Sequence, residues 1–285
     1  MSARLRDIAR RTEEIVAAGR YRTEDGREIS IAEDLARALA GTTLHGPGPV
    51  PFPATSDAGS GAGSDIGRTA RIEVTGESST EAARRLTTAV PDAPVAVLNF
   101  ASARNPGGGY LNGAQAQEEA VCRASALYAT LLRAPAYYEH HRADRDPFYT
   151  DRVIHSPGVP VFRDDRGRLL DRPYTVGFLT SPAPNAGVIR RRTPELAARI
   201  PAALASRAER VLETAAAHGY GRLVLGAWGC GVFRNDPAEV AGAFRALLTG
   251  DGRFAGRFEE VVFAILDRTR DAGTLAAFRE AFPAA

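Results

Sequence analysis

The sequence predicts an α/β fold with a mixed, mostly parallel sheet that is covered by helices on both faces. From Thr69 onward, short apolar or alternating runs are followed in turn by segments of helical periodicity, which is typical of such a sheet. The run VAVLNFAS at residues 95–102 is continuously apolar and ends in polar residues, as expected of a strand buried on both faces. The chain has 285 residues, of which 44% are hydrophobic, so it can form one large domain with an extension.

The first segment of the chain predicts a helix, a hairpin and a second helix. Residues 4–18 have amphipathic helical periodicity, and a short helix is expected over residues 31–40. Between them, YRTEDGREISI alternates around Asp25-Gly26, which is a strong signal for a two-residue hairpin turn. We therefore expect residues 1–45 to form an N-terminal extension of helix and hairpin.

The segment GPGPVPFPATSDAGSGAGSDIG, residues 46–67, is rich in proline, glycine and serine. This composition indicates a mobile loop or linker. The expected organisation is thus an extension over residues 1–45, a loop over 46–67 and a catalytic domain over 68–285.

The sequence of residues 68–285 predicts alternating strands and helices. The expected strands are ARIEVTG (70–76), VAVLNFAS (95–102), RVIHSPGVPVF (152–162), YTVGFLTSP (174–182), RLVLGAWGCG (222–231) and EEVVFAILD (259–267). The expected helices are STEAARRLTTAV (79–90), which has a Ser/Thr cap, then 118–132, 193–218, 237–248 and DAGTLAAFREAF (271–282).

Composition excludes several classes of protein. The net charge is only +2, so nothing requires a nucleic-acid or membrane partner. The sequence contains no lysine, which excludes Schiff-base chemistry and a phosphate-binding P-loop lysine. Two cysteines cannot form a disulfide framework. Without a signal-peptide pattern or a long apolar run, we expect a cytoplasmic protein, and its composition is that of a bacterial one.

Two predicted strands end in glycine-rich loops, VAVLNFASARNPGGG and RLVLGAWGCGVFRND. In an open α/β sheet, ligands bind beyond the carboxyl ends of the strands, and successive glycine N–H groups can approach an anion closely. The dinucleotide and Walker patterns fit neither loop. Either loop alone could be a tight turn, but two at strand ends favour a site for a nucleotide-like ligand.

The most specific pattern is a triple glycine, Gly107 to Gly109, followed after seven residues by Gln117-Glu118-Glu119. With NPGGG, GCGVF, the N-terminal helix and hairpin, HSPGVPVFRD and TSPAPNAG, it resembles the bacterial-type poly(ADP-ribose) glycohydrolases of the macrodomain superfamily. The resemblance implies a three-layer α/β/α macrodomain-like fold. It covers nearly the whole chain except residues 46–67.

The resemblance also implies a role for each residue of these motifs. Glu119 would be the catalytic acid, and Glu118 would help to hold the ribose and the groups near the phosphates. The first loop would cradle the terminal ribose, the second would wrap the diphosphate, and Phe233 would pack near the departing ribose. The residues implied to bind the substrate are Asn105, Gly107, Gly108, Gly109, Gln117, Gly229, Cys230, Gly231, Val232 and Phe233.

The chemistry of two adjacent glutamates agrees in outline with these roles. Neighbouring residues of a helix point about 100° apart, so Glu118 and Glu119 cannot act as a facing pair of glycosidase carboxylates. One of them is expected to do chemistry while the other positions the substrate. The alternative interpretation is a charged first helical turn with no catalytic role.

The expected function is hydrolysis of the ribose–ribose O-glycosidic bond of poly(ADP-ribose), as an exo-acting glycosidase that releases ADP-ribose. Glu119 would protonate the departing oxygen and then deprotonate the attacking water. We expect no cofactor and no metal. The expected partners are poly(ADP-ribose), ADP-ribose and ADP-ribosylated proteins, with no DNA and no membrane.

Two other functions remain open from the sequence. A hydrolase that removes single ADP-ribose units from proteins could use the same pocket. A non-catalytic ADP-ribose-binding macrodomain is the third possibility, although a pure reader has no use for the intact acid pair.

Cys230 lies between two glycines and could be a nucleophile with His155 or His218 as its base. No local signature of a thiol hydrolase surrounds it. His140-His141 lacks the spacing of metal ligands.

Asp267 ends the last predicted strand, so it could contact an adenine or a ribose, or equally cap the next helix. Trp228 is expected in the core rather than in contact with a ligand.

Overall fold

The structure of the chain is a computed structural model that describes residues 2–53 and 70–283. Its helices are α1 (Ala3–Ala18), α2 (Ala32–Gly41), α3 (Ser79–Ala89), η1 (Tyr110–Asn112), α4 (Gln117–Ala124), α5 (Leu127–Leu131), α6 (Pro135–Ala143), α7 (Ala186–Arg192), η2 (Pro194–Arg199), α8 (Ile200–Ala217), α9 (Pro237–Leu248) and α10 (Gly273–Ala281). Its strands are β1 (Arg20–Arg22), β2 (Glu28–Ser30), β3 (Thr43–His45), β4 (Arg71–Thr75), β5 (Val95–Phe100), β6 (Val153–Arg163), β7 (Leu169–Ser181), β8 (Arg222–Leu225) and β9 (Glu260–Ala264).

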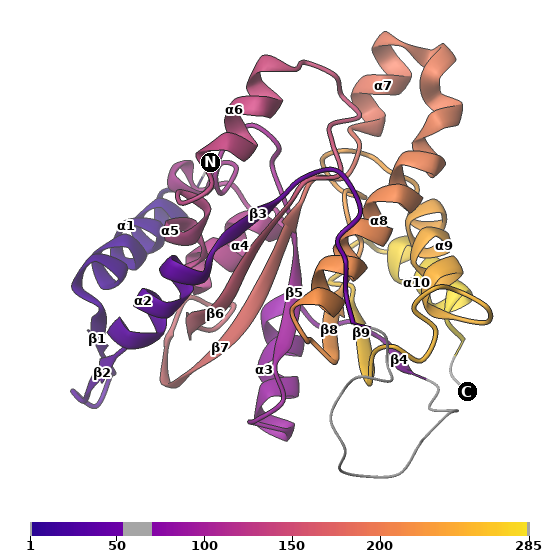
Figure 1. Cartoon of the computed structure of the whole chain (residues 1–285). Helices are drawn as coiled ribbons and strands as arrows, with labels where there is room; N and C mark the ends of the chain where they lie inside the picture. The colour runs from indigo at the N-terminus through magenta and orange to yellow at the C-terminus, as the bar shows by residue number, and fades with distance from the viewer. Residues whose placement is uncertain (1, 54–69, 284–285) are drawn as a thin grey trace, which may run out of the picture.

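The main sheet has seven strands in the order β3-β6-β7-β5-β8-β9-β4, and β1 pairs with β2 in a separate hairpin (Figure 1). The strands β7, β5, β8, β9 and β4 are parallel to one another. Strand β6 is antiparallel to β7, and β3 is antiparallel to β6. The predicted mixed, mostly parallel sheet is therefore confirmed.

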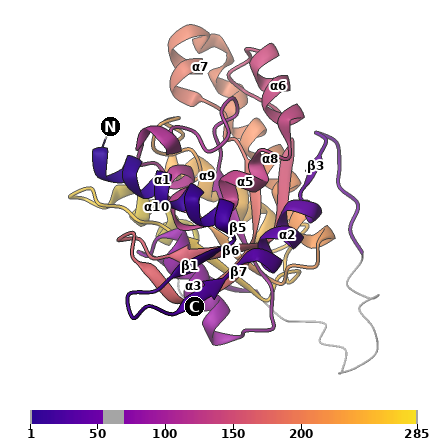
Figure 2. The same cartoon turned by 90° about the vertical axis from the view of Figure 1, so that its left-hand side faces the viewer.

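Helices cover both faces of this sheet, and the central strand contributes to both cores. In β5, Ala96 and Leu98 belong to a core shared with α7 to α10, whereas Val95 and Val97 belong to one shared with α1 to α6. Figure 2 shows α1, α2 and α5 in front of the sheet, with α8 and α9 behind it. This alternation explains why the strand is apolar at successive positions.

The N-terminal hairpin is present, but its loop is longer than predicted. Thr23 N donates to Arg27 O at 2.9 Å and Gly26 N donates to Thr23 O at 3.0 Å, which leaves the three residues 24–26 in the loop. Gly26 has a φ of 85°, the left-handed conformation that closes a three-residue hairpin loop. The expectation of a two-residue turn at Asp25-Gly26 was therefore wrong.

The segment that follows the second helix joins the main sheet. Strand β3 pairs with β6, with Leu44 opposite Ile154. After it, Val50 N donates to Glu213 Oε2 of α8 at 2.8 Å, and the ring of Phe52 stacks on Phe254 at 5.4 Å. Residues 54–67 of the predicted loop lie outside the described residues.

The helix predicted over residues 118–132 is two helices, α4 and α5. The interruption is Ser125, whose backbone is extended and whose side chain donates to Val121 O at 2.7 Å and accepts from Leu127 N at 3.2 Å. Ala126 N then donates to Pro160 O of β6 rather than continuing the helix. A serine that satisfies local backbone groups in this way competes with helical hydrogen bonding.

The helix predicted over residues 193–218 also divides. Its first turns form the 3₁₀ helix η2, and the α-helix α8 begins at Ile200. Pro201 lies in the first turn of α8, where the missing N–H costs nothing, whereas the same residue inside a longer α-helix would break it.

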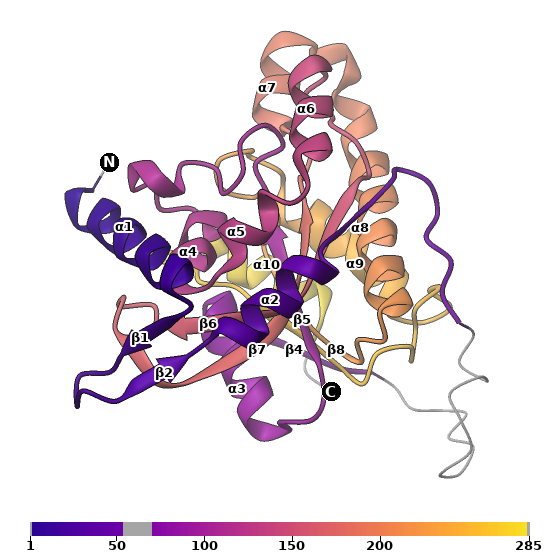
Figure 3. The ribbon, with the colours of Figure 1, turned by 60° about the vertical axis from the view of Figure 1, so that its left-hand side comes forward.

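Four of the elements that the structure describes were not predicted: β3, η1, α6 and α7. Strand β3 has only three residues, and α7 is a short helix in which three of seven residues are arginine. Helices α6 and α7 both project beyond the end of the sheet (Figures 1 and 3).

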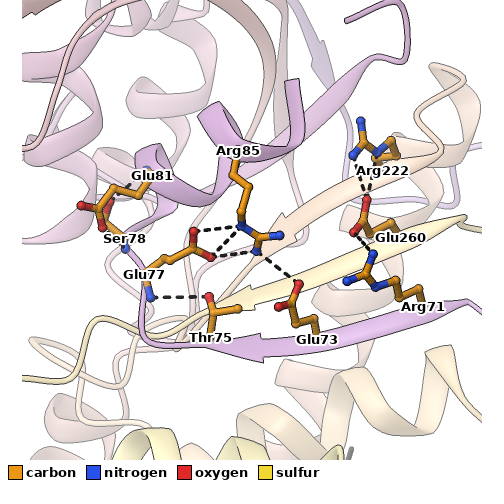
Figure 4. Close-up of polar contacts among 9 residues, drawn as sticks. All are labelled: Arg71, Glu73, Thr75, Glu77, Ser78, Glu81, Arg85, Arg222 and Glu260. Atoms are coloured by element: carbon orange, nitrogen blue, oxygen red, sulfur yellow. Dashed lines mark hydrogen bonds and ion pairs between the residues drawn. The ribbon is translucent and has the colours of Figure 1, made fainter. Parts of the chain in front are cut away.

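Ion pairs fasten β4 and β9 at one edge of the sheet, and we call them the β4-edge pairs (Figure 4). Arg85 of α3 contacts Glu77 at 2.8 Å and Glu73 at 3.2 Å. Glu260 of β9 contacts Arg222 of β8 at 2.8 Å and Arg71 of β4 at 3.5 Å. Glu73, Glu77 and Glu260 are thus each neutralised by at least one guanidinium.

Among residues 2–53 and 70–283, no helix is both long and apolar enough to cross a membrane.

Candidate active site

The first glycine loop follows β5 and has a backbone that only glycine forms easily. Gly107 and Gly108 have φ values of 64° and 58°, in the left-handed region. Gly108 N donates to Asn105 O at 2.9 Å, and Tyr110 N donates to Gly107 O at 2.9 Å, so two consecutive turns close the loop. The side chain of Asn105 is exposed.

The loop places Gly108 directly over the two glutamates of α4. A Cβ added to Gly108 would lie 2.5 Å from Glu119 Oε1 and 3.1 Å from Glu118 Oε2. The next residue, Gly109, donates its N–H to Glu119 Oε1 at 2.8 Å. Only a residue without a side chain therefore fits at position 108 above the two carboxylates.

Glu118 is held beneath the loop by groups of β5 and the loop itself. Its side chain is 2% exposed, and its Oε2 accepts the Ser102 N–H at 2.7 Å. Its Oε1 accepts Asn99 Nδ2–H at 3.2 Å, and the same Nδ2 donates to Thr180 Oγ1 at 3.2 Å. Burial raises the pKa of Glu118 to about 8, the two hydrogen bonds oppose this rise, and neighbouring Glu119 adds to it. Glu118 is therefore mostly protonated at pH 7.

Glu119 differs from Glu118 in having one oxygen without a partner. Glu119 is 7% exposed, and its Oε1 accepts the Gly109 N–H. Its Oε2 is buried and has no hydrogen bond among the described residues. A buried polar atom without a partner is costly in a folded protein. The Oε2 atom of Glu119 therefore keeps unused hydrogen-bonding capacity, as does the buried Oδ1 atom of Asn99.

Gln117 attaches the start of α4 to β5. Its Nε2 donates to Leu98 O at 2.9 Å and to Ser79 Oγ at 3.0 Å, and its Oε1 accepts the Phe100 N–H at 2.9 Å. The sequence predicted that Gln117 contacts the substrate. In the structure its amide is directed at the sheet, where it fixes the helix that carries both glutamates.

The second glycine loop follows β8 on the neighbouring strand. Gly229 has a φ of 71°, and a Cβ on it would lie 2.5 Å from both Ala183 Cβ and Asn235 Nδ2. Buried Asn235 closes this loop, because its Nδ2 donates to Pro184 O at 2.8 Å and to Gly229 O at 3.2 Å. Gly231 has open space where a Cβ would stand.

The tip of this loop is exposed and reaches the first loop through aromatic contacts. Val232 is 78% exposed. The ring centroids of Phe233 and Tyr149 are 5.8 Å apart. The guanidinium carbon of Arg104, in the first loop, lies 5.9 Å from the centroid of the same tyrosine ring. Tyr149 has a φ of 58°, which is unusual for a residue with a side chain.

The structure does not provide Cys230 with a histidine base. Its recorded hydrogen bond is to Trp228 O at 3.9 Å, and burial raises the pKa of its thiol to about 12. His218 precedes β8 whereas Cys230 follows it, and the ring of His155 stacks on that of His218 at 3.6 Å. Both histidines therefore lie away from the thiol, and the alternative of a thiol nucleophile loses its base.

Helix α1 supports the first glycine loop from behind. The hydroxyl of buried Tyr110 donates to Glu13 Oε1 at 2.9 Å and contacts Ala9 O at 3.2 Å. Thr12 donates to Arg123 O of α4 at 3.0 Å. One helix of the extension thus contacts both the loop and the helix that together frame Glu119.

Two further candidates have structural roles. Asp267 Oδ2 accepts the N–H groups of Thr274 and Leu275 at 2.9 and 3.4 Å, so Asp267 caps α10. Trp228 is 1% exposed and donates to Ser181 O at 3.0 Å, as expected of a core residue.

The sequence interpretation missed Asn99, Ser102 and Asn235, which hold Glu118 and the second loop. An asparagine inside the apolar run VAVLNF was the one signal that could have drawn attention to Asn99, because a buried amide needs partners. Within the part of the chain that the structure describes, no three His, Cys, Asp or Glu side chains gather as metal ligands would.

Comparison with known proteins agrees with the motifs. A family model described as the catalytic domain of microbial-type PARG matches residues 9–164. A comparison with curated proteins gave no match.

Three solved structures illustrate the similarity. The chain is 51% identical to poly(ADP-ribose) glycohydrolase from Thermomonospora curvata, with a TM-score of 0.89 over 99% of this chain and 100% of the other. The same enzyme bound to the inhibitor ADP-HPD is 49% identical by this comparison, with a TM-score of 0.87 over the same shares. Poly(ADP-ribose) glycohydrolase from Deinococcus radiodurans in complex with ADP-ribose is 44% identical, with a TM-score of 0.76 over 87% of this chain and 96% of the other.

Proposed function

This chain belongs to the microbial-type poly(ADP-ribose) glycohydrolase family, and from that premise we propose that Glu119 is the general acid of its reaction. The protein is a glycosidase that acts on poly(ADP-ribose). The observation that carries the assignment of Glu119 is its buried Oε2 atom, which has no partner among the described residues, while the other oxygen of the same carboxyl group lies beside Gly108.

The reaction needs one group that can give and then take a proton. Glu119 Oε2 protonates the ribose oxygen as the ribose–ribose bond breaks, and the resulting carboxylate deprotonates the water that attacks the anomeric carbon. The N–H of Gly109 fixes Oε1, so the other oxygen faces the bond.

The two loops divide the terminal ADP-ribose unit between them. The first loop, with Gly107 to Gly109 and Asn105, holds the ribose that is cleaved, and Glu118 beneath it orients that ribose. The second loop, Gly229 to Phe233, holds the diphosphate with its backbone N–H groups. This arrangement favours exo action, in which the terminal unit leaves as ADP-ribose.

Chromatography of the products tests the bond that is cleaved. Incubation with poly(ADP-ribose) should give free ADP-ribose and neither AMP nor phosphoribosyl-AMP. AMP-type products would show that the diphosphate is cut and would exclude the glycosidase mechanism.

The same assay separates the two alternatives. A protein that carries a single ADP-ribose unit is the matched substrate, and we expect its modification to persist while the polymer disappears. Release from the mono-modified protein at a comparable rate would favour a mono-ADP-ribosyl-protein hydrolase, and binding without any release would indicate a reader.

A further inference from the structure

Four exposed arginines are grouped beside the second glycine loop, three at the end of α7 and one at the end of the loop itself. Helix α7 ends with the exposed residues Arg190, Arg191 and Arg192, and Arg234 is exposed at the end of the loop. We call these four residues the α7 basic surface. The neighbouring chain adds to this charge. Residues 186–199 include Arg199 besides the three arginines of α7 and contain a single carboxylate, Glu195.

Direct contacts hold Arg234 against α7. Arg190 donates Nη1–H to Arg234 O at 2.9 Å. The aliphatic stem of Arg234 lies across Gly187, where an added Cβ would be 3.2 Å from Arg234 Cδ. Arg234 has a φ of 56°, a conformation that a residue with a side chain adopts only when its surroundings impose it.

The basic surface is continuous with the active site. Gly187 N donates to Phe233 O at 2.9 Å, which fastens α7 to the residue that we place beside the departing ribose. Phe233 in turn contacts Tyr149, beneath Arg104 of the first loop. The four arginines therefore begin one residue beyond Phe233, outside the pocket for the terminal unit.

Most of this positive charge has no carboxylate to neutralise it. Arg190 Nη2 lies 3.7 Å from Glu239 Oε2. The other three arginines of this surface make no ion pair with any described residue. Arginines at the carboxyl end of a helix are favoured by its dipole. That effect does not account for Arg234, which is not part of the helix.

We propose that the α7 basic surface binds phosphates of the polymer on the far side of the bond that is cleaved. The proposal rests on the function described above, because each unit of poly(ADP-ribose) carries a diphosphate. The terminal unit occupies the two loops, and the remaining chain leaves past Phe233, where the arginines would meet its next phosphates. Such contacts would raise the affinity for the polymer without contacting free ADP-ribose.

The test compares Arg191→Gln/Arg192→Gln with the matched control Arg166→Gln/Arg172→Gln. The control removes two exposed arginines at the turn and start of β7, at the other end of the sheet. At low salt we expect the α7 variant to raise KM for long polymer about 3- to 10-fold, because two surface charge contacts are lost, with kcat unchanged. The difference should shrink as the salt concentration rises. The control should match the wild type.

Binding measurements then separate this proposal from a general loss of affinity. Calorimetry with free ADP-ribose should give dissociation constants within about two-fold for the wild type and both variants. In a Glu119→Gln background, which preserves the polymer, labelled poly(ADP-ribose) should bind more weakly when Arg191 and Arg192 are also changed.

Two results would overturn the proposal: an unchanged KM for polymer, or an equal loss of affinity for polymer and for ADP-ribose. Neither result would affect the glycosidase activity, which is tested by the products that the wild-type protein releases from polymer, or the assignment of Glu119, which is tested by Glu119→Gln.

Discussion

Glutamates gather in two parts of this molecule, and the protein neutralises them differently. At the β4 edge, Glu73, Glu77 and Glu260 each contact an arginine. At the start of α4, Glu118 and Glu119 form no ion pair with any described residue, and backbone and amide N–H groups contact them instead.

The difference agrees with the roles proposed above, in which one group of carboxylates stabilises the sheet and the other acts on the substrate. An arginine holds a carboxylate in its charged form, which suits an edge of the sheet that only has to stay together. N–H groups fix the position of a carboxyl group without adding a full positive charge, so Glu118 keeps a raised pKa and Glu119 keeps an unpartnered oxygen.

The largest expected effect is on the rate after Glu119→Gln. The amide keeps the shape and the hydrogen bond from Gly109, but it cannot protonate the departing oxygen. We expect kcat to fall about 10³- to 10⁴-fold or more, because the ribose alkoxide is a poor leaving group. Affinity for ADP-ribose, measured by calorimetry, should stay within a few-fold.

Cys230→Ala is the matched variant for that experiment, since it changes the other nucleophilic candidate. It should retain most of its activity. If Glu119→Gln were active and Cys230→Ala inactive, the acid assignment would be wrong.

Gly108→Val should abolish binding of ADP-ribose. Its Cβ would lie 2.5 Å from Glu119 Oε1 in a left-handed backbone, and its side chain would fill the approach to both carboxylates. Calorimetry on folded protein measures the loss, with Gly76→Val as the control because open space surrounds Gly76. Unchanged affinity in Gly108→Val would place the ligand elsewhere.

Glu118→Gln should weaken binding and rate together, by roughly ten- to a hundred-fold, because a group that orients the ribose changes. It should also alter the response of stability to pH. The pKa of Glu118 is about 8 in the folded protein and 4.5 without perturbation, so its contribution is present below pH 4.5 and is lost as the pH rises through 8. Between pH 6 and 9 the Tm of the wild type should therefore fall more than that of Glu118→Gln. An equal fall in both proteins would contradict a protonated Glu118.

The β4-edge pairs should behave in the opposite manner, with an effect on stability alone. Glu260→Gln leaves Arg222, whose side chain is 5% exposed, without its carboxylate, and we expect a loss of about 2–3 kcal/mol in the free energy of unfolding. Glu77→Gln removes a partly exposed partner of Arg85, so about 0.5–1 kcal/mol should be lost. Denaturant titration measures both, and kcat should not change. A lower kcat in folded Glu260→Gln would show that the two groups of glutamates are coupled.

Much of the fold was accessible from local patterns. The buried strand β5, the capped helix α3 and the helix α9 lie where the sequence predicts them, because apolar runs, a Ser/Thr cap and an Asp-Pro start act within a few residues. The breaks in α4–α5 and η2–α8 were missed because they depend on Ser125 and Pro201 in a tertiary setting. Strand β3 was missed because three residues cannot show a period, and its pairing with β6 involves partners about 110 positions apart.

The candidate site also has features that the sequence could predict and features that depend on the fold. The triple glycine and the glutamate pair are local motifs, and the structure brings them together as expected. The pKa of Glu118 depends on groups that only the fold brings together, because burial and Glu119 raise it whereas the hydrogen bonds from Ser102 and Asn99 oppose the rise. The direction of the Gln117 amide could not be known before β5 and α4 were placed side by side.

The support of the first loop by α1 has a consequence for the order of folding. Tyr110 contacts Ala9 and Glu13, which precede it by 101 and 97 positions, so this contact closes a very long loop of chain. Contacts between such distant positions form slowly compared with helices and neighbouring strands. During refolding, helical structure should return first, and the catalytic loop should gain its final shape only when α1 docks. The recovery of enzymatic activity would therefore lag behind the recovery of secondary structure, although the residues proposed to be catalytic lie outside α1.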